Sequence, residues 1–280
     1  MIKLNEKERK ILRIENPVEC IIVERVNRFV VKVCLDGKLC MAYINNTGRL
    51  LEYLAKGRKG FCIKNEKRGK TDYRLFSLRE NDFGVVIDTQ LQMKAFEKAL
   101  EMKLIPRLSG CKILRRNAKL GLSLIDYLLE CNRKKVYLEV KSAVLREGKY
   151  AMYPDCPSSR GRKHIKELID HVQRGGRGII LFIAALPQVE SFRPNKSADP
   201  EMYELLRKAY KSEVDIKSIN LYYNPEDSII CLFNSNLKIV IENLEKKINT
   251  AIKKILISPL FLFSISVCFQ TIQSHFESPY

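Results

Sequence analysis

The hydrophobic pattern of the first part of the chain predicts short β-strands. Apolar and β-branched runs cover 20–24, 29–35, 39–43 and 83–88. Asp36-Gly37, between the second and third runs, is a dipeptide that favours a two-residue hairpin turn. Short strands at this spacing are typical of a small barrel or sandwich. We expect an OB-like β-barrel over residues 1–86.

The pattern changes near residue 87, where helices and strands begin to alternate. Helices are expected over 91–104, 160–174 and 200–210, and strands over 112–116, 122–130, 135–141, 178–185, 218–223 and 229–233. Thr89 is the expected N-cap of the first helix. The run 178–185 has no polar alternation, which indicates a strand buried on both faces. This order predicts an α/β (α+β) domain on a mixed sheet over residues 87–241.

The last segment, 242–280, has a different composition. Residues 255–274 carry no charge, and this length reaches that of a membrane-spanning helix. Pro259 and several Ser and Gln residues argue against a span, and 261–269 alternates with the period of a strand. An added strand or docked tail, an interfacial segment and a span all remain open. We assign the tail no role and rank membrane contact last.

Charge and cysteine content narrow the class of protein. Lys and Arg number 50 against 32 Asp and Glu, a net charge of +18 that predicts a polyanionic partner. Nine Cys without a Cys-x-x-Cys pair indicate neither a zinc site nor a disulfide framework. The first residues are charged and do not resemble a secretory signal, so a cytoplasmic location is expected. Without Trp or a Gly-rich nucleotide loop, a sugar enzyme is not supported.

Acidic residues on a predicted hairpin are the sharpest chemical signal. The runs 123–130 and 135–141 flank a short turn and should pair in an antiparallel manner. The register then places Asp126 opposite Glu139, and Leu124 opposite Lys141. The other face of both strands is almost wholly apolar and is therefore expected to be core.

Two opposed carboxylates call for a proton or a cation between them. Their Cβ atoms would lie about 4.5–5.5 Å apart, a distance at which the charges repel. Mg²⁺ or Mn²⁺ takes oxygen ligands and needs only one or two carboxylates. Lys141 on the same face would orient a water or stabilise charge on a phosphate. The alternative is a solvated hairpin face with incidental charges.

Two predicted helices carry further candidates. Glu97 lies at the rim of the apolar stripe of helix 91–104, and it would complete a nuclease-like acid cluster if that helix covered the charged hairpin face. Otherwise Glu97 would face water. Ser158 or Ser159 is expected to cap the helix over 160–174, where Arg160 and His164 share an arc suited to phosphate contact. The alternative is a capped surface helix with basic side chains.

Several motifs together resemble one known family. They are Arg25-Val-Asn-Arg-Phe29, Asn46-Thr-Gly-Arg-Leu50, Gly121-Leu-Ser-Leu-Ile-Asp126, Glu139-Val-Lys-Ser142, Pro154-Asp155, Arg160-Gly161, His164, Phe192-Arg-Pro194 and Asp199-Pro200. Their order and spacing are similar to those of the sugar fermentation stimulation protein A (SfsA) family over about residues 15–241. Leu124 departs from the pattern, because the family usually has Arg at this position.

The resemblance implies a fold and a set of site residues. Members are described as DNA-binding, with an N-terminal OB-like domain and a C-terminal domain similar to PD-(D/E)xK nucleases. Asp126 and Glu139 match the metal-binding acids of that superfamily, Lys141 its catalytic lysine and Glu97 its additional helix acid. The residues similar to DNA-contacting motifs are Arg25, Asn27, Arg28, Phe29 and Arg49.

These observations leave more than one function open. The first hypothesis is a DNA-binding protein with a Mg²⁺- or Mn²⁺-dependent nuclease site. The second is a non-catalytic DNA-binding regulator of sugar metabolism genes, and the third is membrane attachment through the tail. We expect DNA binding to be non-specific or weakly specific. Whether catalysis is retained, which DNA strands are preferred and whether the chain forms homo-oligomers are left open.

Overall fold

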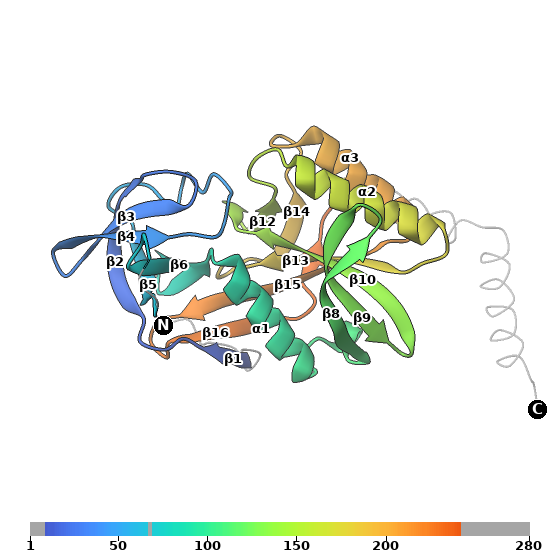
Figure 1. The fold of residues 1–280 in the computed structure, drawn as a ribbon, viewed down its shortest axis with the longest axis horizontal. Helices are drawn as coiled ribbons and strands as arrows, with labels where there is room; N and C mark the ends of the chain where they lie inside the picture. Colours follow the sequence, from blue (N-terminus) through green and yellow to red (C-terminus); the bar gives the residue numbers. More distant parts are fainter. Residues whose placement is uncertain (1–8, 67–68, 242–280) are drawn as a thin grey trace, which may run out of the picture. The chain divides into compact units, whose positions relative to one another are not determined.

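The computed structural model describes residues 9–66 and 69–241 (Figure 1). The predicted tail over 242–280 lies outside these residues. The strands of the first part are β1 (Arg9–Arg13), β2 (Val18–Arg25), β3 (Val30–Leu35), β4 (Lys38–Tyr43), β5 (Lys59–Lys64), β6 (Tyr73–Glu80) and β7 (Phe83–Val86). Within the described ranges, no helix is both long and apolar enough to cross a membrane.

The strands from β2 to β6 close into a barrel. β2, β3 and β4 form a meander, β4 runs parallel to β6, and β5 pairs with both β6 and β2. Asp36 and Gly37 both have positive φ, at 47° and 79°, as the predicted two-residue turn requires. The expected OB-like barrel is confirmed. β1, β5 and β6 were not predicted from the hydrophobic pattern.

The second part of the chain builds the mixed sheet that was expected. Its elements are α1 (Thr89–Glu101), the 3₁₀ turn Pro106–Leu108, β8 (Cys111–Leu120), β9 (Ser123–Cys131), β10 (Lys134–Ala143), β11 (Leu145–Glu147), β12 (Tyr150–Tyr153), α2 (Ser159–Gln173), β13 (Gly178–Ala184), β14 (Ser191–Pro194), α3 (Pro200–Lys211), β15 (Asp215–Asn224), β16 (Ile229–Asn234) and β17 (Lys238–Ile239). β10, β13 and β15 are parallel neighbours, whereas β8, β9 and β16 are antiparallel. β7 pairs with β6 and β15 and so joins the barrel to this sheet.

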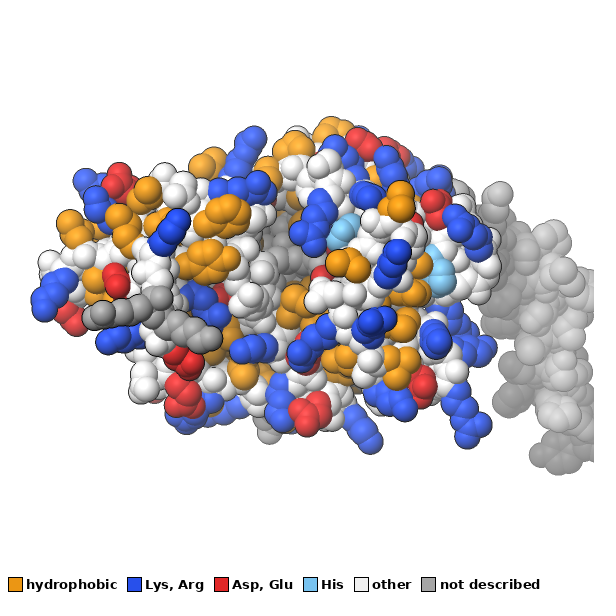
Figure 2. Space-filling view, in the orientation of Figure 1, with side chains coloured by type: hydrophobic (Ala, Val, Ile, Leu, Met, Phe, Trp, Pro, Cys, Tyr) orange, Lys and Arg blue, Asp and Glu red, His pale blue; other side chains and the backbone are white. Residues whose placement is uncertain are grey.

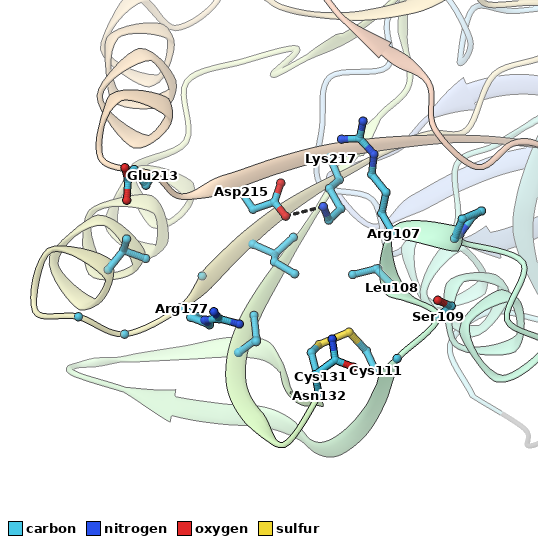
Figure 3. A pocket seen from close by; sticks show the side chains of 18 residues that line it. Arg107, Leu108, Ser109, Cys111, Cys131, Asn132, Arg177, Glu213, Asp215 and Lys217 are labelled. Atoms are coloured by element: carbon cyan, nitrogen blue, oxygen red, sulfur yellow. Dashed lines mark ion pairs between the residues drawn. A yellow bond between two sulfur atoms is a disulfide. The ribbon is translucent and has the colours of Figure 1, made fainter.

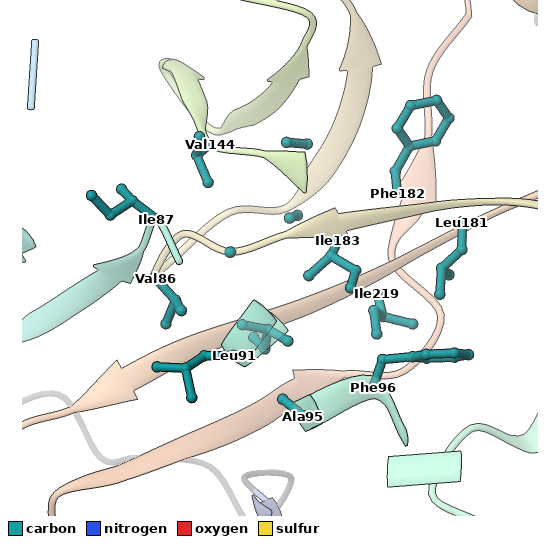
Figure 4. Packing of buried hydrophobic residues seen from close by; sticks show 14 of the residues in the cluster. Val86, Ile87, Leu91, Ala95, Phe96, Val144, Leu181, Phe182, Ile183 and Ile219 are labelled. Carbon is teal, nitrogen blue, oxygen red and sulfur yellow. The ribbon is translucent and has the colours of Figure 1, made fainter. Parts of the chain in front are cut away.

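Helices cover both faces of the sheet (Figure 1). α1 packs on one face, where Leu91 and Phe96 lie on the same side of β13 as Ile183 (Figure 4). α2 and α3 lie on the other face. Phe182 points to this second side and stacks on Phe192 of β14, with ring centroids 3.9 Å apart. β13 is buried along its whole length, as its unbroken apolar run predicted.

The helix caps follow the sequence pattern only in part. The α2 cap is Ser158, whose Oγ accepts a hydrogen bond from Gly161 N at 3.0 Å, as expected. The α1 cap is Asp88 rather than Thr89, because the Asp88 carboxylate accepts from Leu91 N at 2.9 Å. Thr89 N instead donates to Asn45 Oδ1 in the barrel.

A disulfide joins Cys111 and Cys131, so the expectation that the cysteines form no bridge is wrong. The two residues are direct partners in the antiparallel β8–β9 pair. They are 20 residues apart in the sequence, and no spacing motif marks them. Only the register of the hairpin brings them together.

Candidate metal centre

The predicted register of the acidic hairpin is confirmed. The β9–β10 ladder runs from Cys131 and Lys134 to Tyr127 and Leu138. Asp126 and Glu139 are the next positions, and the ladder stops before them. Asp126 Oδ2 instead accepts a hydrogen bond from Val140 N at 2.7 Å. The strands therefore separate at the point where the two acids lie.

Glu139 is the buried member of the pair. Its Oε1 accepts a hydrogen bond from Lys141 Nζ at 2.6 Å and lies 2.6 Å from His164 Nδ1 on α2. Its Oε2 is buried and has no hydrogen-bond partner. A buried carboxylate oxygen without a partner is costly, so this atom is an open acceptor that a cation or a water would satisfy.

Burial and mutual repulsion separate the pKa values of the two acids. Burial, with the nearby charge of Glu139, raises the pKa of Asp126 to about 6. Burial also acts to raise the pKa of Glu139, but Lys141 and His164 outweigh it, and the pKa falls below its usual value. Burial acts to lower the pKa of Lys141, whereas the Glu139 charge raises it overall. Glu139 and Lys141 therefore form a charged pair at neutral pH.

This arrangement fits a hard divalent cation. Two carboxylates come from neighbouring strands, and one of them has a free buried oxygen. Within residues 9–66 and 69–241, no group of three or more His, Cys, Asp or Glu residues is placed to hold a metal ion. A cation bound here would therefore take the two acids as ligands, and water would fill its remaining positions. Mg²⁺ commonly binds in this way.

Glu97 does not join this pair. α1 covers the opposite face of the sheet, where Glu97 accepts hydrogen bonds from Tyr127 Oη at 2.8 Å and from Arg116 Nη2 at 2.5 Å. Tyr127 follows Asp126 in β9, and successive side chains of a strand point to opposite faces. The condition under which Glu97 would complete the acid cluster, α1 lying over the charged hairpin face, is therefore not met.

Two predicted phosphate contacts on α2 lie beside the acid pair. His164 is buried against Glu139, and Arg160, one turn earlier, is exposed. Both line a groove of about 450 Å³, together with Leu122 and Leu124 of the β8–β9 hairpin. His164 thus lines the groove and also contacts Glu139 of the acid pair.

The Arg25 side chain is hydrogen-bonded to the backbone. Its guanidinium donates hydrogen bonds to the carbonyl oxygens of Asn27, Arg28, Gly48 and Arg49. These bonds hold the β2–β3 turn against the loop over 46–50. Arg25 therefore shapes the surface that the other motif residues present.

The remaining barrel candidates are at the surface. Asn27 Oδ1 accepts from Phe29 N at 2.9 Å and fixes the turn. The Phe29 side chain is 44% exposed, with the Arg28 guanidinium 5.9 Å from its ring centre. Arg49 is also exposed. An exposed aromatic ring among arginines suits base stacking with phosphate contact.

Two aspartates in the matching motifs, Asp155 and Asp199, hold loops in place. Asp155 Oδ2 accepts from Leu50 N at 3.1 Å, and a Cβ on Gly48 would collide with the same carboxylate. The barrel loop over 46–50 therefore docks on the loop before α2. Asp199 accepts from Ser158 N and from Arg162 and holds that loop from its other side. Only the Asp199-Pro200 cap pattern carries a local signal for either residue.

A larger cavity of about 690 Å³ lies beside the disulfide (Figure 3). It is lined by Cys111, Cys131 and the exposed Arg177, and by an ion pair between Asp215 and Lys217. Neither acid of the β9–β10 pair lines it. The acid pair instead adjoins the smaller groove through the contact between Glu139 and His164.

Basic side chains cover much of the surface. Figure 2 shows Lys and Arg spread over the visible face, with Asp and Glu scattered between them. The net charge of +18 is thus distributed rather than confined to one tail. This distribution suits contact with an extended polyanion.

Comparisons with known proteins agree with these features. A sequence model described as the SfsA N-terminal OB domain matches residues 23–87, and one described as the sugar fermentation stimulation protein RE domain matches residues 90–227. The sugar fermentation stimulation protein homolog of Pyrococcus furiosus is 46% identical over 221 residues, which are 79% of this chain and 96% of that protein. The homolog of Archaeoglobus fulgidus is 45% identical over 233 residues, 83% of this chain and 100% of that protein.

A solved structure is similar as well. The structure of Pyrococcus furiosus SfsA in complex with Ca²⁺ superposes with a TM-score of 0.80 at 44% identity, and the match covers 83% of this chain and 99% of that one. Sequence and fold agree over both the barrel and the mixed-sheet domain. The chain belongs to the sugar fermentation stimulation protein (SfsA) family.

Proposed function

We propose that this chain binds DNA and that its second domain holds a Mg²⁺- or Mn²⁺-dependent phosphodiesterase site. The observation that carries the proposal is the buried, unpartnered Oε2 of Glu139 beside the Asp126 carboxylate. The complex of the Pyrococcus furiosus relative with Ca²⁺ supports a divalent cation as the ligand.

Each residue of the site has a distinct role. Asp126 and Glu139 hold the cation, which when bound supplies Lewis-acid polarisation of a phosphate oxygen and lowers the pKa of water. Lys141 is fixed by its 2.6 Å hydrogen bond to Glu139. Its amino group, kept protonated by that carboxylate, donates to a phosphate oxygen and stabilises the negative charge that develops there.

The barrel supplies the contacts that bind DNA. Phe29 offers a stacking surface, while Arg28 and Arg49 are exposed cations for the backbone. Because Asp155 docks the barrel loop against the loop before α2, the barrel surface and the acid pair are parts of one binding surface. The affinity should fall steeply with salt, since phosphate contacts release counterions.

Cleavage of DNA with Mg²⁺, Mn²⁺ or EDTA tests the catalytic proposal. We expect cleavage with either ion and none with EDTA. Asp126→Asn and Lys141→Met should each lower the rate by about a hundredfold or more. Glu130→Gln is the matched control, because Glu130 lies on the same face of β9 and pairs with Lys112 at 2.9 Å. Cleavage that is equal in all four proteins, or absent with both ions, would reject the proposal.

A DNA-binding regulator without catalysis is the second candidate. Glu139 Oε1 already contacts both Lys141 and His164, so the chain itself neutralises much of the charge of this acid. This compensation favours a nuclease scaffold that needs no ion. The regulator predicts DNA binding that survives EDTA and Asp126→Asn and that prefers a defined sequence.

A further inference from the structure

The β8–β9 turn presents an apolar side chain to solvent. Leu122 is 85% exposed, more than any other large hydrophobic side chain in the described part of the protein. The side chain of a leucine stabilises a fold when it is buried, and this side chain is almost wholly exposed. The side chain is therefore available for contact with a ligand.

Polar contacts from α2 hold Leu122 in place. Its backbone N donates to Glu167 Oε1 at 3.1 Å, and its backbone O accepts from Lys163 Nζ at 3.2 Å. The preceding Gly121 has a φ of +54°, and a Cβ there would collide with the Glu167 carboxylate. The turn is thus anchored through its backbone while the leucine side chain projects outward.

The anchored leucine stands at the rim of the groove that borders the acid pair. Arg160 and Lys163 line this groove, and so does His164, which contacts Glu139. Leu124 of β9, 54% exposed, adds a second apolar side chain two residues later. Cations suited to phosphates therefore surround an apolar projection, and a strand of DNA is the occupant with complementary chemistry.

We propose that Leu122 is a wedge that enters the base stack of bound DNA next to the acid pair. The inference rests on the proposed function and defines its substrate class, which is duplex DNA with a mismatched or unpaired base. Apolar side chains inserted at a base step unstack it, which costs free energy. That cost is smallest where the stack is already weakened. The wedge therefore selects such positions and brings the adjoining phosphate to the site.

Binding in EDTA tests the wedge without any cleavage. The probes are two short duplexes of the same sequence, one fully paired and one with a single mismatch, each with 2-aminopurine beside the central step. We expect the wild type to bind the mismatched duplex about tenfold more tightly and to raise its fluorescence, because unstacked 2-aminopurine is brighter. Leu122→Ser should bind both duplexes within about twofold of each other and leave the fluorescence unchanged.

Matched variants separate the wedge from a general effect. Leu39→Ser removes another exposed leucine, 63% exposed at the β3–β4 hairpin, and should keep the preference. Leu122→Met should keep it as well. A preference that survives in Leu122→Ser, or a wild type that binds both duplexes equally, overturns the wedge and leaves the proposed function standing. A wild type that binds neither duplex overturns both, and Leu122 would then be assigned to a protein partner.

Discussion

The Asp126 carboxylate accepts a hydrogen bond from the backbone N–H of Val140, at 2.7 Å, where β9 and β10 leave their ladder. The Asp126 side chain thus binds a backbone N–H of the neighbouring strand. The bond fixes the carboxylate beside Glu139 and holds the strands apart. The proposed cation site would therefore arise from an interruption of the sheet rather than from an added loop.

The pKa of Asp126 predicts that this acid destabilises the cation-free protein. With a folded pKa of about 6 against 3.8 for the free side chain, the folded state binds more protons between these values. Stability must therefore fall as pH rises through that range. In EDTA at about pH 8, Asp126→Asn should be more stable than the wild type by on the order of 1–2 kcal/mol. At about pH 4 the two should be equal.

Thermal unfolding at both pH values measures this difference. Mg²⁺ should raise the Tm of the wild type at the higher pH and leave that of Asp126→Asn unchanged. An Asn variant that is less stable than the wild type at both pH values would contradict the account. The acid would then be part of the ordinary framework.

We expect Glu97→Gln to have a small effect on stability and on cation binding. Glu97 contacts Arg116 and Tyr127 on the far face of the sheet, and a glutamine can still accept from the tyrosine. We expect a loss of about 1 kcal/mol or less in stability and a cation Kd within about twofold of the wild type. A Kd that rises tenfold or more would place Glu97 in the metal site after all.

Gly48→Ala should weaken DNA binding and leave the acid pair unchanged. The new methyl group collides with the Asp155 carboxylate, and overpacking of this kind costs about 1–3 kcal/mol. The loop over 46–50 would shift, and the exposed Arg49 would move with it. Gly69→Ala is the control, because nothing lies within 4 Å of a Cβ at that position.

DNA affinity and cation affinity, measured side by side, check the role of this loop. Gly48→Ala should lose DNA affinity and keep its cation Kd, and Gly69→Ala should keep both. Equal DNA affinity in the two variants would mean that docking of the loop on Asp155 plays no part in DNA binding.

The Cys111–Cys131 disulfide predicts a redox-dependent stability. Thiol titration of the denatured protein should find two fewer thiols before reduction than after it. Reduction, or the double replacement of both cysteines by serine, should lower the free energy of unfolding by about 2–4 kcal/mol. Cys156→Ser, at a cysteine outside the bridge, should have little effect. Identical thiol counts before and after reduction would show that the bridge does not form.

The acid pair was predictable because local chemistry determines the hairpin register. Asn132 and Arg133 take positive φ values of 50° and 63° in a two-residue turn, and period-2 alternation then fixes the facing residues. The role of Glu97 was not predictable. A helical stripe shows which side of α1 is buried, but not which face of the sheet it covers.

Long-range contacts account for the other differences. Arg25 bonds to carbonyl oxygens 23 and 24 residues away, so its motif could not distinguish a DNA contact from a support for the backbone. His164 was predicted to meet phosphate, yet it reaches Glu139, 25 residues earlier. Such pairings depend on how α2 packs on the sheet, which periodicity alone does not determine.

Calorimetric titration with Mn²⁺ is the most direct test of the cation site proposed between Asp126 and Glu139. The wild type and Glu130→Gln should bind one ion with the same Kd, and Glu139→Gln should lose most of that binding, because the replacement removes the charge and one of the two carboxylates. The same Kd in all three proteins would contradict the account and leave the buried Oε2 of Glu139 without its proposed ligand.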